Sequence, residues 1–317
     1  MNEQLTTDQH ATERRGRSTW FWVLIGGSLF AVFLAVIVGV AYAIVHTAGG
    51  GQLSSIGAGL GSGNIGVIDV DGVILNADTP VDQLRKFADD NSIKAIVLHI
   101  DSPGGGAAAS QEIYEEVRRI RDEKKKPIVA SIESVGASGA YYIASGTGKI
   151  YANRASIVGS IGVIMEYTNY GDLLKWAKLK NVTIKAGELK DAGSPTRDLT
   201  PKEQAYMQGL VDNMHTQFIE DVAAGRAQPV AQIQPLATGQ VWTGQQALPL
   251  HLIDSVGSFR DTLLATAKQV GISGEPQVVK PVIKRKTLLE ALTAPGDLFP
   301  GPEKLLERNV GFYFLWR

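Results

Sequence analysis

The sequence predicts an α/β domain preceded by one transmembrane helix. Residues 20–45 form a continuous apolar run that contains no charged side chain. From residue 64 onward, short apolar runs alternate with segments of helical spacing, which is typical of α/β domains. The longest helical segment begins with a capping signal, in which Thr200 and Pro201 are followed by Glu203. These three observations define the fold class.

The apolar run is long enough to cross a bilayer, whose core requires about 20 apolar residues in a helix. Between Arg17 and Asp69 there is no Asp, Glu, Lys or Arg, whereas Arg14 and Arg15 also precede the run. The positive-inside rule therefore places the segment before the run in the cytoplasm and the segment after it outside. A cleaved signal peptide is the alternative, although its apolar core is usually about 7–15 residues long.

The expected layout follows from these patterns. The Gly- and Ser-rich stretch after the anchor is typical of a flexible tether. The segments are a cytoplasmic N-terminus at 1–19, an anchor at 20–46, a linker at 47–63, a catalytic domain at 64–280 and a C-terminal tail at 281–317. The tail, which ends in the apolar run Phe312–Trp316, is expected to lie outside the core.

Composition excludes several classes of function. The 317 residues carry a formal net charge of -1, without the basic excess that is typical of nucleic-acid-binding proteins. There is no cysteine, which rules out disulfides, thiolate nucleophiles and cysteine zinc sites. The five histidines are scattered without metal-ligand spacing. We therefore expect no metal, no cofactor and no nucleic-acid partner.

Within the domain, apolar runs and helical spacing predict the elements in order. Strands are expected at 65–70, 93–100, 127–132, 149–152, 156–164 and 182–185. Helices are expected at 79–91, 107–123, 138–145 and 200–224. On the last helix an apolar stripe, made of Tyr206, Leu210, Met214, Phe218 and Val222, predicts packing on the core along one face.

Two short motifs are candidates for chemistry, and each is weak alone. Ser138 stands between small residues at a predicted strand-to-helix turn, where the helix N-terminus favours an anionic intermediate. The same pattern also fits an ordinary N-cap serine. The DSPGGG loop at 101–106 is compatible with an oxyanion hole, a phosphate cradle or a tight turn. It lacks the Lys and Ser/Thr of a P-loop.

A serine nucleophile requires a base. His99 is one candidate, with Asp101 two residues further on the same side of the strand, but it stands within a buried apolar run that favours a structural histidine. Lys190, in a Gly-rich stretch after a predicted strand, is the other candidate. Burial beside a hydroxyl group favours the neutral amine that a base must have. Taken alone, Lys190 also fits a solvated surface lysine.

Several ordered motifs resemble the signal peptide peptidase A family of serine peptidases, family S49, in its short bacterial form. The resemblance extends from about residue 65 to 257. Its motifs are DSPGGG at 101–106, ASGAYYIAS at 137–145, VGSIGVI at 158–164, GELKDAGSP at 187–195 and GQVWTG at 239–244.

This resemblance implies roles for the candidate residues. Ser138 would attack the peptide carbonyl, Lys190 would take its proton, and Ser160 would hydrogen-bond and orient the lysine. The backbone N–H groups implied for the oxyanion hole are those of Gly105 (or Gly104) and Gly139. The implied fold is the Clp-protease/crotonase-like spiral of β-β-α units. The implied assembly is a dome-like homo-oligomeric ring, octameric in the family, whose adjacent protomers shape the groove.

The family degrades the apolar remnants of signal peptides, which implies an anchored endopeptidase acting on the outer face of the cell membrane. The resemblance also implies a tail that is trimmed or that binds in a neighbouring groove, while docking on its own domain is the alternative. Two other functions remain open at this point. A crotonase-like acyl-CoA enzyme would share the fold, and a catalytically silent membrane scaffold would need neither Ser138 nor Lys190.

Overall fold

Parallel strands form the centre of the domain in the computed structural model, which describes residues 64–281 and 311–316. The central strands are β1 (Asn64–Asp71), β2 (Ile93–Ser102) and β4 (Ile128–Ala137). The large sheet has the order β10-β1-β2-β4-β5-β9, and β6 and β8 extend it from the end of β4. All its pairs are parallel except β6 with β8. The result is a mixed α/β architecture with a parallel-rich sheet.

The central strands are buried on both faces, as their continuous hydrophobicity predicts. Because side chains alternate along a strand, Ile65 and Val67 face one side while Ile68 and Val70 face the other. The first side packs against helix α9 (Phe259–Gln269) and the second against the larger core. These buried strands therefore provide rigid supports for the loops and turns that follow their carboxyl ends.

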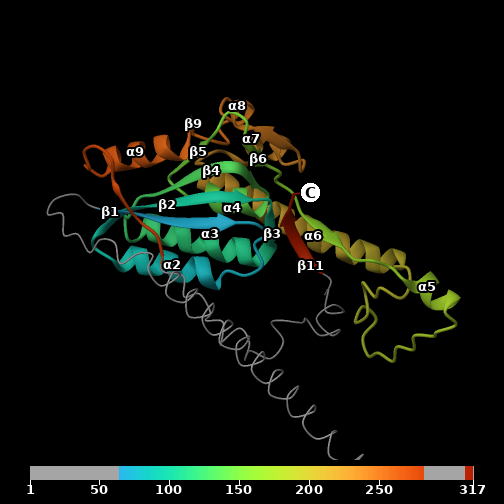
Figure 1. Cartoon of the computed structure of the whole chain (residues 1–317). Coiled ribbons are helices and arrows are strands. Elements are labelled where there is room, and N and C mark those ends of the chain that lie inside the picture. The colour runs from blue at the N-terminus through green and yellow to red at the C-terminus, as the bar shows by residue number, and fades with distance from the viewer. Residues whose placement is uncertain (1–63, 282–310, 317) are drawn as a thin grey trace, which may run out of the picture. The chain divides into compact units, whose positions relative to one another are not determined.

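Four helices cover the larger core (Figure 1). They are α2 (Asp78–Asp89), α3 (Ala107–Asp122), α4 (Gly139–Ser145) and α6 (Pro201–Gly225). The capping signal at Thr200 is confirmed, since its side chain accepts a hydrogen bond from the N–H of Glu203 and Glu203 returns one to the Thr200 N–H. The longest helix thus begins where the sequence predicts.

The smaller elements complete the sheet and its edges. They are β5 (Lys149–Ala152), β6 (Ile157–Gly159), α7 (Val230–Ile233), the 3₁₀ helix η1 (Gln234–Leu236), β8 (Val241–Thr243), α8 (Gly244–Ala247), β9 (Ser255–Val256) and β10 (Gln277–Val279). The single strand expected at 156–164 is instead two strands, β6 and β7 (Ile164–Glu166). The chain breaks at Ser160, whose backbone φ of 53° cannot continue a strand.

A second, antiparallel sheet corrects the expectation that the tail lies outside the core. Strand β11 (Gly311–Leu315) lies between β3 (Gly104–Gly106) and β7. The side chain of Phe314 is only 3% exposed and belongs to the main core cluster. This end of the chain is therefore part of the folded domain, because it supplies the strand that pairs with the glycine loop.

Residues 171–199, here called the arm, differ from the rest of the domain. The arm lies beyond the N-terminal end of α6, away from the large sheet, and contains helix α5 (Gly171–Trp176) (Figure 1). The strand expected at 182–185 is wrong, since these residues are exposed and form no strand. Val182 and Ile184 are apolar but have no sheet edge to join, so β-branched composition alone does not make a strand.

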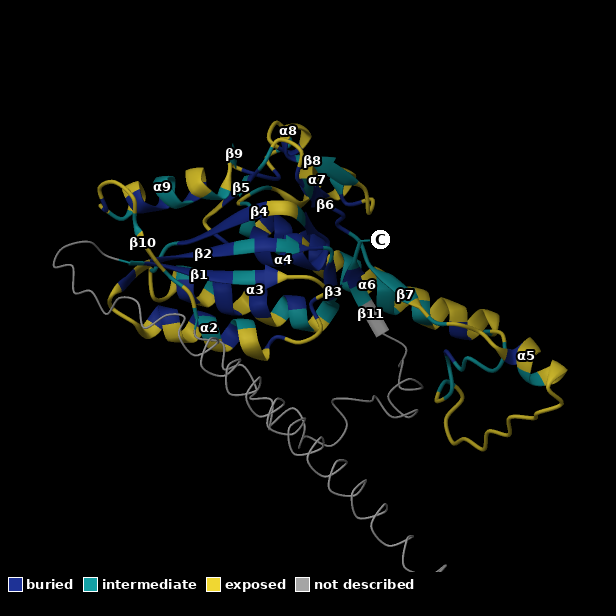
Figure 2. Cartoon of the chain, in the orientation of Figure 1, coloured by how far each residue is buried: buried dark blue, intermediate teal, exposed yellow. Residues whose placement is uncertain are grey.

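The predicted apolar stripe on α6 is correct for only part of the helix. Phe218 and Val222 are fully buried, whereas Tyr206 is 43% exposed. The reason is that the N-terminal part of α6 extends toward the arm, past the sheet and the helices that cover it, which are here called the body (Figure 2). None of the helices within residues 64–281 has the length and apolar character required to cross a bilayer. The anchor expected at 20–46 falls outside the described residues.

Candidate active site

Ser138 occupies a sharp turn between β4 and α4. Its backbone has φ 54° and ψ -118°, a region that non-glycine residues rarely adopt and that costs about 1–3 kcal/mol. The turn is held on both sides, because the Ser138 N–H donates to the Gly159 carbonyl at 2.7 Å and its carbonyl accepts from the Tyr142 N–H at 2.8 Å. Such a strained strand-to-helix turn is the usual way to present a nucleophilic hydroxyl.

The glycine loop after β2 lies directly against this turn. A methyl group on Gly104 would lie 2.6 Å from the Gly139 nitrogen, and one on Gly139 would lie 3.2 Å from the Gly105 nitrogen. The loop is fixed to β4 by the Asp101 carboxylate, which accepts from the Val135 N–H at 3.0 Å. Only residues without a side chain permit this approach, since Gly104 also has a φ of 95°.

Of the two alternative loop donors, the geometry favours Gly105. The N–H of Gly104 already donates to the Ser102 hydroxyl at 3.1 Å. The N–H of Gly139 belongs to the first turn of α4, where backbone donors have no acceptor within the helix. Ser102 and the buried Ser110, whose hydroxyl donates to the Gly106 carbonyl at 2.9 Å, support this arrangement. No spacing signal distinguished these two serines in the sequence.

The C-terminal strand marks the centre of the site. Phe314 pairs with Gly105 in an antiparallel register, and two residues later the Trp316 N–H donates to the Pro103 carbonyl at 2.8 Å. Hydrogen-bonded pairs alternate in such ladders, so the Gly105 N–H points at the Phe314 carbonyl. A methyl group on Gly139 would lie 3.1 Å from the same oxygen. The Phe314 carbonyl thus lies opposite Gly105 and close to the backbone of Gly139.

Ser160 lies beside this turn. It follows Gly159, the acceptor for the Ser138 N–H, and it is 6% exposed. Its own N–H donates to the Gln240 carbonyl at 2.8 Å, which fixes its unusual backbone. Ser160 lines a cavity of about 530 Å³ that also contacts Leu315 and Trp316. The cavity therefore lies between Ser160 and the end of the C-terminal strand.

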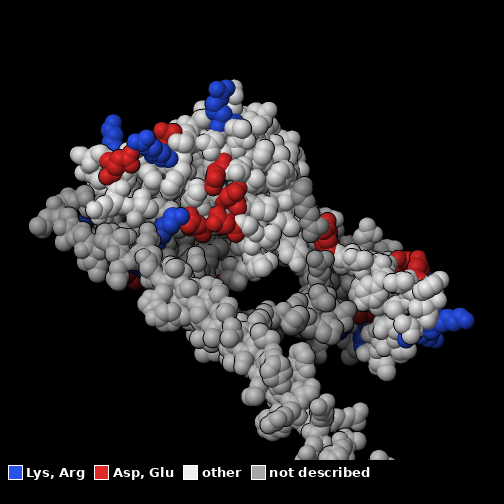
Figure 3. All heavy atoms as spheres, viewed as in Figure 1, with Lys and Arg blue, Asp and Glu red and all other residues white. Residues whose placement is uncertain are grey.

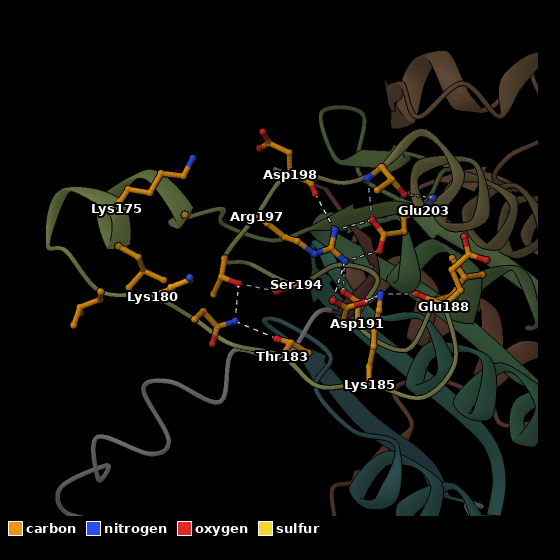
Figure 4. A pocket seen from close by; sticks show the side chains of 17 residues that line it. Lys175, Lys180, Thr183, Lys185, Glu188, Asp191, Ser194, Arg197, Asp198 and Glu203 are labelled. Atoms are coloured by element: carbon orange, nitrogen blue, oxygen red, sulfur yellow. Dashed lines mark hydrogen bonds and ion pairs between the residues drawn. The ribbon is translucent and has the colours of Figure 1, made fainter.

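The structure does not bring Lys190 to Ser138 within one chain. Lys190 is exposed on the arm, and its ammonium makes no hydrogen bond or ion pair with any residue that the structure describes. The neighbouring side chains of the arm are linked by ion pairs around a cavity of about 640 Å³ (Figure 4). Ser138, Ser160 and the three glycines converge, while the candidate base is displayed elsewhere.

His99, the other candidate base, is occupied differently. Its ring nitrogens lie 3.3 Å from the Asp69 carboxylate and 3.5 Å from that of Glu133. The ring also packs at a tilt against that of Phe259 on α9, with centroids 4.3 Å apart. No hydrogen bond joins His99 to Ser138 in the described part of the chain. These contacts are those of a structural histidine.

Comparison with known proteins identifies the family. The family model described as Peptidase family S49 matches residues 120–273. A Synechocystis protein named as a candidate protease is 38% identical over 212 residues, which cover 67% of this chain and 76% of that protein. An Enterococcus faecium protein named as a candidate signal peptide peptidase SppA is 35% identical over 187 residues, covering 59% of this chain and 54% of that protein.

A third relative is longer. Protease 4 of Haemophilus influenzae is 32% identical over 208 residues, which cover 63% of this chain and 34% of that protein. The matched segment includes Ser138, Ser160 and Lys190. The chain therefore belongs to peptidase family S49, the signal peptide peptidase A family, and is a serine-type peptidase.

Proposed function

We propose that this peptidase is a membrane-anchored endopeptidase with a Ser138/Lys190 dyad, which degrades cleaved signal peptides and other apolar peptides. The observation that carries the proposal is the position of β11. An extended segment pairs with the glycine loop, and its Phe314 carbonyl lies opposite Gly105 and close to the backbone of Gly139. A substrate bound in the same way would present its carbonyl beside the Ser138 turn.

In the proposed reaction, the Ser138 hydroxyl oxygen attacks this carbonyl carbon and the proton passes to the neutral amine of Lys190. The glycine N–H groups stabilise the oxyanion, which is often the largest single contribution in acyl transfer. The protonated lysine then donates to the leaving amine, and water releases the acyl group by the same route. Ser160, beside the cavity, would hydrogen-bond and orient the lysine.

We propose that Lys190 reaches Ser138 from an adjacent copy of the chain. The support is physical: one chain holds a nearly complete nucleophile site with an open cavity at Ser160, while its own Lys190 is exposed on the arm. A head-to-tail arrangement of identical copies closes into a ring when the rotation permits. A homo-oligomeric ring, an octamer by resemblance, would repeat the same shared site at every interface.

The proposed substrate class follows from the pocket that Phe314 fills. Its ring stacks on Tyr142 with centroids 5.2 Å apart and contacts Phe218 at 4.6 Å. A pocket with aromatic walls favours an apolar, and especially an aromatic, side chain before the cleaved bond. Apolar peptides such as signal-peptide remnants contain many residues of this kind.

The expected surroundings of the enzyme complete the proposal. An anchor at 20–46, with residues 1–19 cytoplasmic, would hold the catalytic domain at the outer face of the cytoplasmic membrane. A peptidase tethered there meets peptides that the bilayer releases. The parallel-rich α/β architecture supports assignment to the Clp-protease/crotonase-like spiral of β-β-α units.

The test is hydrolysis of an apolar peptide by matched variants. Ser138→Ala and Lys190→Ala should each lower kcat by at least about 10³-fold, as removal of members of a catalytic unit does. Ser134→Ala, an exposed serine four residues away, and Lys180→Ala, an exposed lysine of the arm, should keep full activity. Full activity in either dyad variant would contradict the assignment of that residue.

A further inference from the structure

The turn that carries Lys190 is tied to α6 by charged side chains. Lys190 lies between Glu188 and Asp191 in a turn closed by a hydrogen bond from its own N–H to the Gly187 carbonyl at 3.2 Å. Glu188 forms an ion pair with Lys202 in the first turn of α6. Asp191 pairs with Lys185, whose ammonium also donates to the Glu188 carbonyl at 2.7 Å.

Arg197 makes the central connection in this network (Figure 4). Its guanidinium lies 3.0 Å from the Asp191 carboxylate and donates to the Asp191 carbonyl at 3.3 Å. Its Nη1 and Nη2 atoms donate to the two carboxylate oxygens of Glu203, at 2.8 and 2.6 Å. One side chain thus joins the residue that follows Lys190 to the first turn of α6.

Glu203 is itself held in place by its position at the start of α6. It completes the capping box of α6 and is only 3% exposed. The hydrogen bonds from Arg197 lower the pKa of Glu203 to about 2, so its carboxylate stays charged at neutral pH. The helix that follows is 25 residues long and reaches back into the core at Phe218 and Val222. A group tied to Glu203 is therefore tied to the body.

Apolar packing does little to hold this turn. Trp176, Val182 and Ile184 of the arm are 81%, 71% and 96% exposed, and residues 177–199 form neither helix nor strand. Charged side chains of both signs lie at the surface of the arm (Figure 3). With so little burial, the ion pairs are the principal fixed contacts of the Lys190 turn among the described residues.

We propose that Arg197 is a positioning residue for catalysis, which holds the Lys190 turn on α6 so that the amine is presented in one place. The inference rests on the proposed role of Lys190 as base. A misplacement of about 1 Å in a catalytic group can cost about 10²-fold in rate. Arginine suits the task because its planar, five-donor fork reaches two carboxylates at once, whereas lysine offers a single point charge.

The experiment compares steady-state kinetics of the full-length oligomer on an apolar peptide. Arg197→Gln should lower kcat by about 10–100-fold, because the base is misplaced, while KM changes less than about 2-fold. Arg197→Lys should keep part of the lost kcat, since it retains the charge but not the fork. Arg260→Gln, which removes an exposed arginine of α9 that pairs with Glu275, is the matched control with unchanged kinetics.

A double-variant cycle separates positioning from a structural effect. If Arg197 acts through the Lys190 turn, the losses in kcat for Arg197→Gln and Asp191→Asn should not add when both are combined. Additive losses, or losses that follow melting temperature or oligomer size, would overturn the proposal. Should Arg197→Gln fail to fold, full kcat in the milder Arg197→Lys together with Asp191→Asn would overturn it as well.

Two outcomes keep this inference distinct from the proposed function. Wild-type kcat in Arg197→Gln, with Lys190→Ala inactive, would overturn the role of Arg197 and leave the dyad intact. An active Lys190→Ala would instead remove the proposed base, and the inference on Arg197 would fall with it. Loss of activity in Lys190→Ala with a selective, non-additive loss of kcat in the Arg197 variants supports both.

Discussion

The body and the arm of this peptidase hold their candidate catalytic groups by opposite means. Ser138 is 1% exposed, and its turn is fixed by backbone hydrogen bonds and by a core that is buried on both faces of the sheet (Figure 2). Lys190 is exposed, and its turn is fixed by ion pairs to the first turn of α6. The turn of the candidate nucleophile is therefore held by packing, and the turn of the candidate base is held by ion pairs.

If Lys190 serves a neighbouring copy, as proposed, the difference explains why the two groups are held by different means. An oxyanion hole requires donors that do not move, and backbone N–H groups held by a packed core meet that need. A base that serves a neighbouring copy must instead be displayed on a projecting element. The arm leaves apolar side chains such as Trp176 and Leu173 exposed, as an element awaiting a partner does.

Stability should show the largest contrast between the two regions. Phe218→Ala, in the body, should lower the free energy of unfolding by about 3–5 kcal/mol, because it leaves a cavity at a fully buried ring. Trp176→Ala, in the arm, should change it by less than about 0.5 kcal/mol, since that side chain is 81% exposed. Urea unfolding of both variants measures the contrast, and equal losses would refute it.

The oxyanion hole offers the next test. Gly139→Ala keeps the backbone N–H but should lower kcat by about 10²-fold, because the new methyl group would lie 3.1 Å from the Phe314 carbonyl oxygen and would displace a substrate carbonyl bound there. That methyl group would also lie 2.3 Å from the Ser110 hydroxyl, so Ser110→Ala is combined with it to relieve the contact. Ser110→Ala alone is the control. Full activity in the combined variant would contradict the placement of the substrate carbonyl beside Gly139.

Acid should loosen the contact that ties the arm to the first turn of α6. Arg197 lowers the pKa of Glu203 to about 2, from an ordinary value of 4.5. A depressed pKa stabilises the native contact above the unfolded value, so this contribution is complete above about pH 4.5 and is lost as pH falls toward about 2. Pepsin cleavage within 171–199, normalised to an unstructured peptide, should rise across that window. An unchanged cleavage rate would contradict the role of the pair.

The sequence predicted the body far better than the arm. Continuous hydrophobicity predicts buried strands such as β2. The capping residues Thr200 and Glu203 predict the start of α6. The Ser138 turn was predicted as a strand-to-helix turn, and the structure adds its strained backbone. These features depend on neighbours close in the chain, which is where sequence patterns are informative.

The arm and the C-terminal strand are regions whose structure such sequence patterns do not predict. Residues 182–185 have strand composition, yet no sheet edge lies beside them, and pairing decides a strand more than composition does. The position of Phe314 depends on β3, more than 200 residues earlier in the chain. Arg197 and Asp191 carried no signal of their own, because an ion-pair network is visible only once the chain is folded.

Mixing two inactive variants tests the central claim, a site shared between copies, most directly. Co-expressed Ser138→Ala and Lys190→Ala chains should form mixed rings in which about a quarter of sites join an intact serine to an intact lysine, if neighbours associate at random in a head-to-tail ring. Peptide hydrolysis should recover to about that fraction of the wild-type rate. Mixed rings as inactive as either variant alone would show that Ser138 and Lys190 do not meet across an interface, and would contradict the account.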